Sequence, residues 1–181
     1  MSALGRLNAL PAEEAEATLR ACCGSTRWAR EMAARRPFRD PAHLREAADE
    51  VWWSLAPADW EEALRAHPRI GERKAAPGQS ERAAAWSAGE QAGVAGTPED
   101  VAAALAEGNR EYERRFGRIY VVCATGKSAE EMLEILRGRL ANDPEAELRI
   151  AAGEQAKITR LRLEKLLAEE SRLPDQKVQA Q

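Results

Sequence analysis

Polar side chains that helix geometry would bury are the features of this sequence best suited to chemistry. At 100° per residue, Arg162 lies about 40° from Ile158, inside the apolar sector of a helix predicted over residues 144–170. A buried guanidinium needs an anion, and its planar fork suits a carboxylate or a planar heterocycle with carbonyl oxygens. The alternative is an internal salt bridge, to Glu154 or to another helix. Arg162 is therefore a candidate anion-binding residue.

A second polar interruption occurs in a helix predicted over residues 80–94. Ser87, Glu90 and Gln91 share one face with Ala83 and Val94, at spacings of three and four residues. Ser87 and Gln91 can donate and accept hydrogen bonds, while an ionised Glu90 only accepts, so together they could contact several edges of a polar ligand. The alternative is a solvated helix face with the alanines turned inward.

His67 is the third candidate, because imidazole exchanges protons near neutral pH. It lies between the end of a predicted helix and Pro68, which stiffens the backbone. Spacing alone favours the alternative, a helix C-cap. The adjacent pair Cys22 and Cys23 has no activating base nearby in the sequence and is typical of helix packing.

Composition excludes several classes of function. The 27 basic and 30 acidic residues nearly cancel, to a formal charge of −3, so no strong field would attract nucleic acid or an anionic membrane. Three cysteines and two histidines favour neither a zinc site nor a disulfide framework, and we expect a reducing, cytoplasmic compartment. No apolar run reaches the ~18–20 residues of a membrane span, and no signal peptide is expected.

The elements that position these residues are predicted to be helices. The chain has 181 residues, room for one domain, and its hydrophobic share of 44% is dominated by alanine and leucine, with only 5% aromatics. We expect an all-α, single-domain bundle over residues 1–170 and a flexible polar tail over 171–181. Ile119–Ala124 is predicted to be one short buried extended segment. The eight expected helices cover residues 11–22, 25–32, 40–55, 57–67, 80–94, 97–117, 128–140 and 144–170.

Five short motifs occur in a fixed order along the chain: His67-Pro68-Arg69-Ile70-Gly71, Ser87-Ala88-Gly89-Glu90-Gln91, Asn109 with Tyr112 and Phe116-Gly117, Cys123 to Ser128, and Glu154-Gln155 with Lys157 to Thr159 and Leu161 to Leu163. In this order they resemble the decarboxylases of 2-oxo-4-hydroxy-4-carboxy-5-ureidoimidazoline (OHCU), which act third in the pathway from urate to allantoin. Leu7 to Leu10 and Arg36 to Phe38 fit as well, so the resemblance spans about residues 5–170.

The resemblance implies an all-helical homodimer that needs no metal or organic cofactor. It implies His67 as the catalytic proton donor, and Glu90 is assigned a catalytic role beside it. Separate enzymes that oxidise urate and hydrolyse 5-hydroxyisourate would be the functional partners. The residues implied to line the substrate pocket are Pro68, Ser87, Ala88, Gly89, Glu90, Gln91, the backbone of Ile119, Tyr120, Val121, Val122 and Cys123, and Arg162.

The chemistry of the implied substrate suits these side chains. Its carboxylate lies next to ring unsaturation, so the electron density left by carbon dioxide can spread into the ring. We hypothesise that His67 assists proton loss from the hydroxyl and then protonates the ring carbon from one face, which gives (S)-allantoin. Two alternatives are a helical module that binds a planar anion without reaction, and a structural bundle in which Arg162 pairs with Glu90 or Glu154.

Overall fold

The computed structural model describes residues 1–72 and 74–172. Within these residues the chain forms nine α-helices and one 3-10 helix, and no strand, which confirms the predicted all-α class. The α-helices are α1 (Ala3–Ala9), α2 (Ala12–Cys22), α3 (Thr26–Ala34), α4 (Pro41–Ser54), α5 (Pro57–Arg65), α6 (Glu81–Glu90), α7 (Glu99–Phe116), α8 (Ala129–Arg139) and α9 (Pro144–Arg172), with the 3-10 helix η1 at Ala92–Val94.

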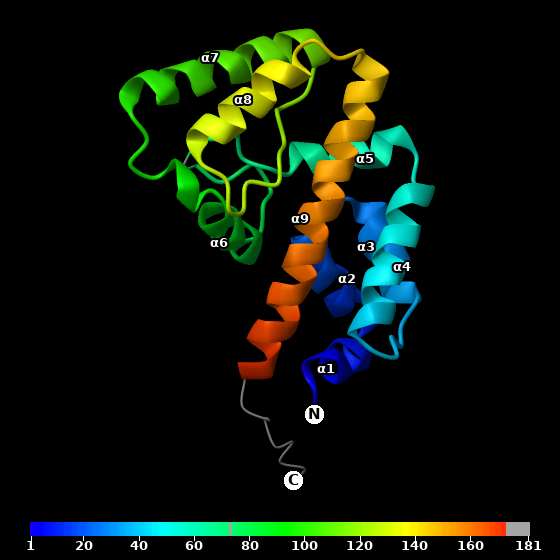
Figure 1. Cartoon of the computed structure of the whole chain (residues 1–181). Coiled ribbons are helices and arrows are strands. Elements are labelled where there is room, and N and C mark those ends of the chain that lie inside the picture. The colour runs from blue at the N-terminus through cyan, green and yellow to red at the C-terminus, as the bar shows by residue number, and fades with distance from the viewer. Residues whose placement is uncertain (73, 173–181) are drawn as a thin grey trace.

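The long helix α9 supports the N-terminal helices, which pack along it (Figure 1). Their shared core contains Trp28, Trp52 and Trp60, all buried. Buried indole N–H groups need acceptors, and each finds a backbone carbonyl; Trp52 Nε1, for example, donates to Ala152 O of α9 at 3.0 Å. This hydrogen bond fixes α4 against α9, and α5 follows directly from α4.

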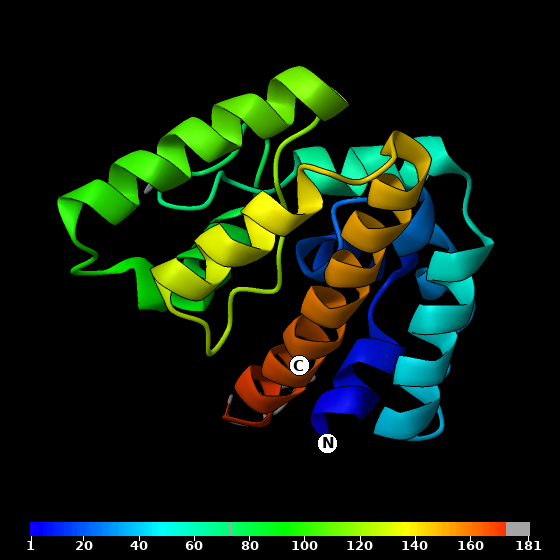
Figure 2. The same ribbon diagram turned by 45° about the horizontal axis from the view of Figure 1, so that its top comes forward.

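Helices α7 and α8 form a hairpin on the other side of α9 (Figure 2). Gly117, with φ of 68°, ends α7 in the left-handed conformation that glycine adopts without steric cost. Ser128 and Glu131 form the capping box that their spacing predicts at the start of α8. Between the two helices the chain runs without regular secondary structure. Tyr120–Ala124 are buried, as predicted, while Ile119, the first residue of the predicted segment, is half-buried.

The helix predicted over residues 80–94 is shorter in the structure, since α6 ends at Glu90 and η1 follows. Gly93 explains the break, because its backbone packs so closely on the loop before α8 that a Cβ would lie 2.1 Å from Lys127 O. Helix α1, capped by the Ser2 side chain, was not predicted. Of the predicted tail, residues 171 and 172 continue α9, and residues 173–181 lie outside the described residues.

Candidate active site

Four segments converge on a small cavity of about 20 Å³: the end of α5, helix α6, the extended segment and α9. Most residues predicted to form the site therefore come together, although they are spread over about a hundred residues of sequence. The predicted residues that line the cavity are His67, Pro68, Ser87, Glu90, Gln91, Tyr120, Val121 and Val122; Ile70, Ala124 and Ile158 complete its wall.

The buried guanidinium of Arg162 is paired with Glu90. Arg162 Nε and Nη2 donate to the two Glu90 carboxylate oxygens at 2.9 and 2.8 Å, and Nη2 also donates to Ser87 Oγ at 3.0 Å. Lys165 Nζ adds a contact at 3.1 Å. Burial alone would raise the pKa of Glu90, but the hydrogen bonds and charge of Arg162, with Lys165, outweigh it and hold that pKa below its usual value.

The ion-pair partner of Arg162 is thus Glu90, on another helix, and not Glu154. Glu154 accepts the backbone N–H of Cys123 at 2.7 Å and pairs with Lys157. Because Glu90 lines the cavity and Arg162 lies behind it, the pair presents a fixed carboxylate and its countercharge at one wall. A bidentate, desolvated pair of this kind is geometrically rigid.

His67 is buried, and its Nε2 lies 2.6 Å from Gln155 Oε1 on α9. Burial and, second to it, the nearby charge of Arg162 lower the pKa of His67 to about 4, while Gln155 and Glu90 oppose the shift. The ring is therefore neutral at neutral pH. Its side chain does not cap α5, whose C-cap residue is Ala66, so the helix-cap interpretation does not describe this ring.

The extended segment is held from both sides. Cys123 donates its N–H to Glu154, and Val121 O accepts from Arg139 Nη1 at 2.7 Å. Among the described residues, none accepts a hydrogen bond from the N–H of Val121 or Val122. Since both residues line the cavity, their N–H groups are candidate donors to a polar ligand there.

Five of the predicted lining residues do not line the cavity: Arg162, which lies behind Glu90, and four others. Ala88 and Gly89 occupy the exposed face of α6, because the helix turns them away from Ser87 and Glu90. Ile119 and Cys123 belong to the extended segment, but they do not line the small cavity. Of these four, only Ala88 faces the neighbouring groove.

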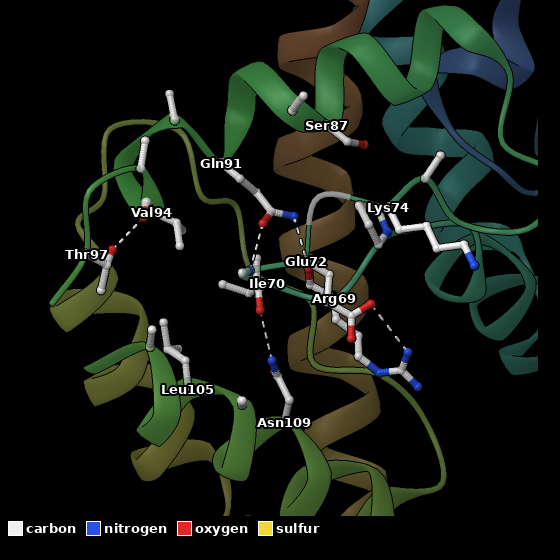
Figure 3. Close-up of a pocket in the computed structure, with 18 of the residues that line it drawn as sticks. Arg69, Ile70, Glu72, Lys74, Ser87, Gln91, Val94, Thr97, Leu105 and Asn109 are labelled. Carbon is white, nitrogen blue, oxygen red and sulfur yellow. Dashed lines mark hydrogen bonds and ion pairs between the residues drawn. The ribbon is translucent and has the colours of Figure 1, made fainter. Parts of the chain in front are cut away.

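An open groove of about 870 Å³ adjoins the cavity and shares Pro68, Ile70, Ser87 and Gln91 with it (Figure 3). Residues 68–71 form part of the wall between the two. Gln91 Oε1 accepts from Gly71 N at 3.0 Å, and Asn109 Nδ2 donates to Ile70 O at 3.0 Å. Gln91, predicted as a ligand contact, thus links residues 68–71 to the C-terminal end of α6 by a hydrogen bond.

Sequence analysis assigned no role to Gln155 or Thr159, both buried next to the site. A signal was present: Gln155, Thr159 and Arg162 recur at spacings of four and three on the apolar side of α9. Because neither side chain is charged, helix spacing alone does not distinguish them from ordinary buried polar residues.

The sequence and the fold of this chain are similar to those of known proteins. A family model described as OHCU decarboxylase matches residues 8–164. The uric acid degradation bifunctional protein TTL of Arabidopsis thaliana is 36% identical over 153 residues, which are 84% of this chain and 47% of that protein. The OHCU decarboxylase of Amia calva is 35% identical over 134 residues, 73% of this chain and 75% of its own.

A crystal structure of OHCU decarboxylase in the presence of (S)-allantoin has the same fold, with a TM-score of 0.71 and 36% identity. The match covers 82% of this chain and 96% of that one. The chain spans about half the length of the Arabidopsis relative. Since the family model covers nearly all of the folded part, and the buried histidine, glutamate and arginine of the motifs meet at one cavity, the chain belongs to the OHCU decarboxylase family.

Proposed function

We propose that this chain decarboxylates OHCU to (S)-allantoin and carbon dioxide without a cofactor. The observation that carries the proposal is the placement of a neutral buried imidazole, His67, at the same cavity as the Glu90–Arg162 pair. A neutral imidazole can take a proton and return it, and a rigid ion pair can orient a polar ring. The relatives named OHCU decarboxylase support this choice of substrate.

The roles follow from position. Glu90, Gln91 and Ser87, together with the N–H groups of Val121 and Val122, would hold the ureido, hydroxyl and ring polar groups, while Pro68 bounds the ring. Arg162 would act through Glu90 and attract the substrate's negative charge. His67 would take the hydroxyl proton and deliver a proton to one face of the ring carbon. Holding reactants in one geometry and in a preorganised polar site supplies the rate enhancement.

Substrate entry requires a rearrangement, because a cavity of about 20 Å³ has room for about one water molecule. The open groove lies across residues 68–71, and we propose that OHCU enters from it. Ala88 would then contact the ligand during entry, whereas Gly89, Ile119 and Cys123 would support the residues beside them.

The test generates OHCU in situ from urate with the two upstream enzymes and follows optical rotation. We expect rapid formation of (S)-allantoin with the wild-type chain and a loss of about 10²–10⁴-fold in rate with His67→Asn. His43→Asn, which alters the other histidine, is the matched control and should keep full activity. Binding of allantoin without faster loss of carbon dioxide would instead indicate a non-catalytic binding module.

Family membership also motivates broader proposals. We propose that residues 1–170 form a single homodimeric domain in the cytoplasm, and that separate urate-oxidising and 5-hydroxyisourate-hydrolysing enzymes supply its substrate. Among the described residues, none of the helices has the length and apolar character needed to cross a membrane.

A further inference from the structure

A chain of buried polar side chains extends from His67 into α9. His67 Nε2 lies 2.6 Å from Gln155 Oε1, and Gln155 Nε2 donates to Thr159 Oγ1 at 3.1 Å. Gln155 is fully buried and Thr159 is 5% exposed. Neither residue lines the cavity or the groove, so neither is placed to touch a ligand.

The orientation of the Gln155 amide determines which ring nitrogen carries the hydrogen. The Gln155 NH₂ group donates to Thr159 Oγ1, whose hydroxyl oxygen accepts this hydrogen bond. The Gln155 oxygen then faces His67, and an amide oxygen only accepts. Nε2 must therefore be the protonated nitrogen of the neutral ring.

The other ring nitrogen remains unprotonated. A neutral imidazole has one N–H group, so Nδ1 keeps a lone pair, and within the described residues Nδ1 makes no hydrogen bond. Because His67 lines the cavity, the basic nitrogen is the one available to a ligand.

We propose that Gln155, itself oriented by Thr159, is a positioning residue that holds His67 as the Nε2–H tautomer and so makes Nδ1 the base of the reaction. The tautomer stands on the geometry alone, and the use of Nδ1 as the base rests on the proposed function. The hydroxyl proton of the substrate moves to Nδ1. The bond to the carboxylate carbon then breaks and carbon dioxide leaves. Its electron pair forms a C=C bond between the two ring carbons, and the electrons of the ring C=N bond move onto its nitrogen.

Two protons complete the reaction. Nδ1 returns its proton to the ring carbon that bears the ureido group, which sets the stereocentre as the hydroxyl carbon becomes a carbonyl. The ring nitrogen that received the electron pair takes a proton from water, and the hydroxide that remains carries the negative charge of the former carboxylate. Atoms and charge balance, and Nε2–H stays bonded to Gln155 throughout.

The charged groups around the ring keep this cycle possible. Glu90 on α6 and Arg162 on α9 act on the ring with opposite signs, and Lys165 is bonded to Glu90. Tyr120 of the extended segment faces the same cavity. Arg65 and Arg69, two residues to either side of His67, are exposed. The His67 ring can therefore accept a proton beside the Glu90 carboxylate and then release it.

Nitrogen-15 NMR of the histidine-labelled full chain tests the tautomer. Because the sequence contains only two histidines, His43→Asn leaves the His67 signals alone in the spectrum. We expect a protonated Nε2 and an unprotonated Nδ1 near neutral pH. Thr159→Val, which removes the hydroxyl at constant volume and frees the amide to flip, should give mixed tautomers, whereas Thr159→Ser should keep the wild-type spectrum.

Steady-state kinetics on the same variants test the catalytic use. We expect Thr159→Val and Gln155→Leu to lower kcat by about 10–100-fold, or ~1.4–2.7 kcal/mol of barrier, with KM little changed because neither side chain touches the substrate. Thr159→Ser should retain activity. An Nδ1–H tautomer in the wild type, or full activity in Thr159→Val despite mixed tautomers, would overturn the proposal. A wild-type chain that shows the tautomer but no decarboxylation would refute the proposed function.

Discussion

Burial determines how His67 behaves, because an enclosed imidazole loses the hydration that stabilises its charge. Its pKa is lowered from 6.5 to about 4, chiefly by burial and then by the charge of Arg162. The ring is thus neutral when the chain is folded but is protonated more readily when the chain unfolds. This difference links the stability of the protein to pH through one residue.

We predict that His67 makes the protein less stable as pH falls from about 6.5 towards 4. In that window the unfolded chain binds more protons than the folded chain, so the free energy of unfolding decreases with decreasing pH. Between pH 7 and 5 the loss is about 2 kcal/mol. Urea denaturation of wild type and His67→Gln at both pH values measures it, since the variant lacks this part of the pH dependence.

His43→Gln is the control and should keep the wild-type slope. The pKa of Glu90 is lowered, so its contribution to stability is lost only as pH falls below the usual range of a carboxyl, outside this comparison. An identical pH dependence for wild type and His67→Gln would show that the ring is not buried as described.

At the level of residues, helix spacing predicted which polar groups point inward, and His67, Glu90 and Arg162 do meet at one site. It did not single out Glu90 as the partner of Arg162, because that pairing depends on how α6 packs against α9. The tautomer of His67 could not be predicted from the sequence either, since its partner Gln155 is 88 residues away, on another helix.

Among the elements, the extended segment has the least local support and relies on a buried ion pair. Arg139 donates to Val121 O and to Glu147 Oε1, each at 2.7 Å, and Tyr112 OH donates to the same carboxylate. The Glu147 side chain is fully buried. Without Arg139, this carboxylate would lose the cation that compensates its charge.

We predict that Arg139→Met destabilises the protein by about 3–5 kcal/mol, because removing one partner of a buried ion pair leaves an unpaired charge. The double variant Arg139→Met, Glu147→Leu should recover much of this loss, since apolar residues can replace such a pair. Urea denaturation of the single and double variants measures both. A cost below about 1 kcal/mol, the usual value of an exposed pair, would contradict the prediction.

Elements with a cap in the sequence were predicted well, as Ser25, Asp40 and Ser128 show by capping α3, α4 and α8. The early end of α6 was not predicted, because it results from contact between Gly93 and the Lys127 backbone, more than thirty residues later in the chain. Local signals determine where helices begin, while tertiary contacts determine this end.

For the whole molecule, the site lies between two separately packed parts. The apolar cluster of α1–α6 and α9 shares no buried residue with the cluster of α7, α8, Ile70 and the extended segment. A third, small cluster joins them, with Leu64 of α5, Val121 and Cys123 of the extended segment, and Ala151 and Ile158 of α9. His67, Gln155 and Arg162 belong to the first part, and Tyr120 to the second.

We predict that the α7–α8 hairpin opens at a lower free energy than the helices packed around α9. Its attachment rests on the small apolar cluster, the Arg139–Glu147 network and a few polar contacts such as Asn109 to Ile70 O. Native-state hydrogen exchange should show faster exchange in α7 and α8 than in α4 and the centre of α9. Under the proposed function, (S)-allantoin at about 100 times its Kd should slow exchange in the hairpin by about 100-fold, because a ligand that contacts both parts must dissociate before they separate. Equal exchange in both parts, with or without allantoin, would instead identify the molecule as one cooperative unit and place any opening for the substrate at residues 68–71 alone.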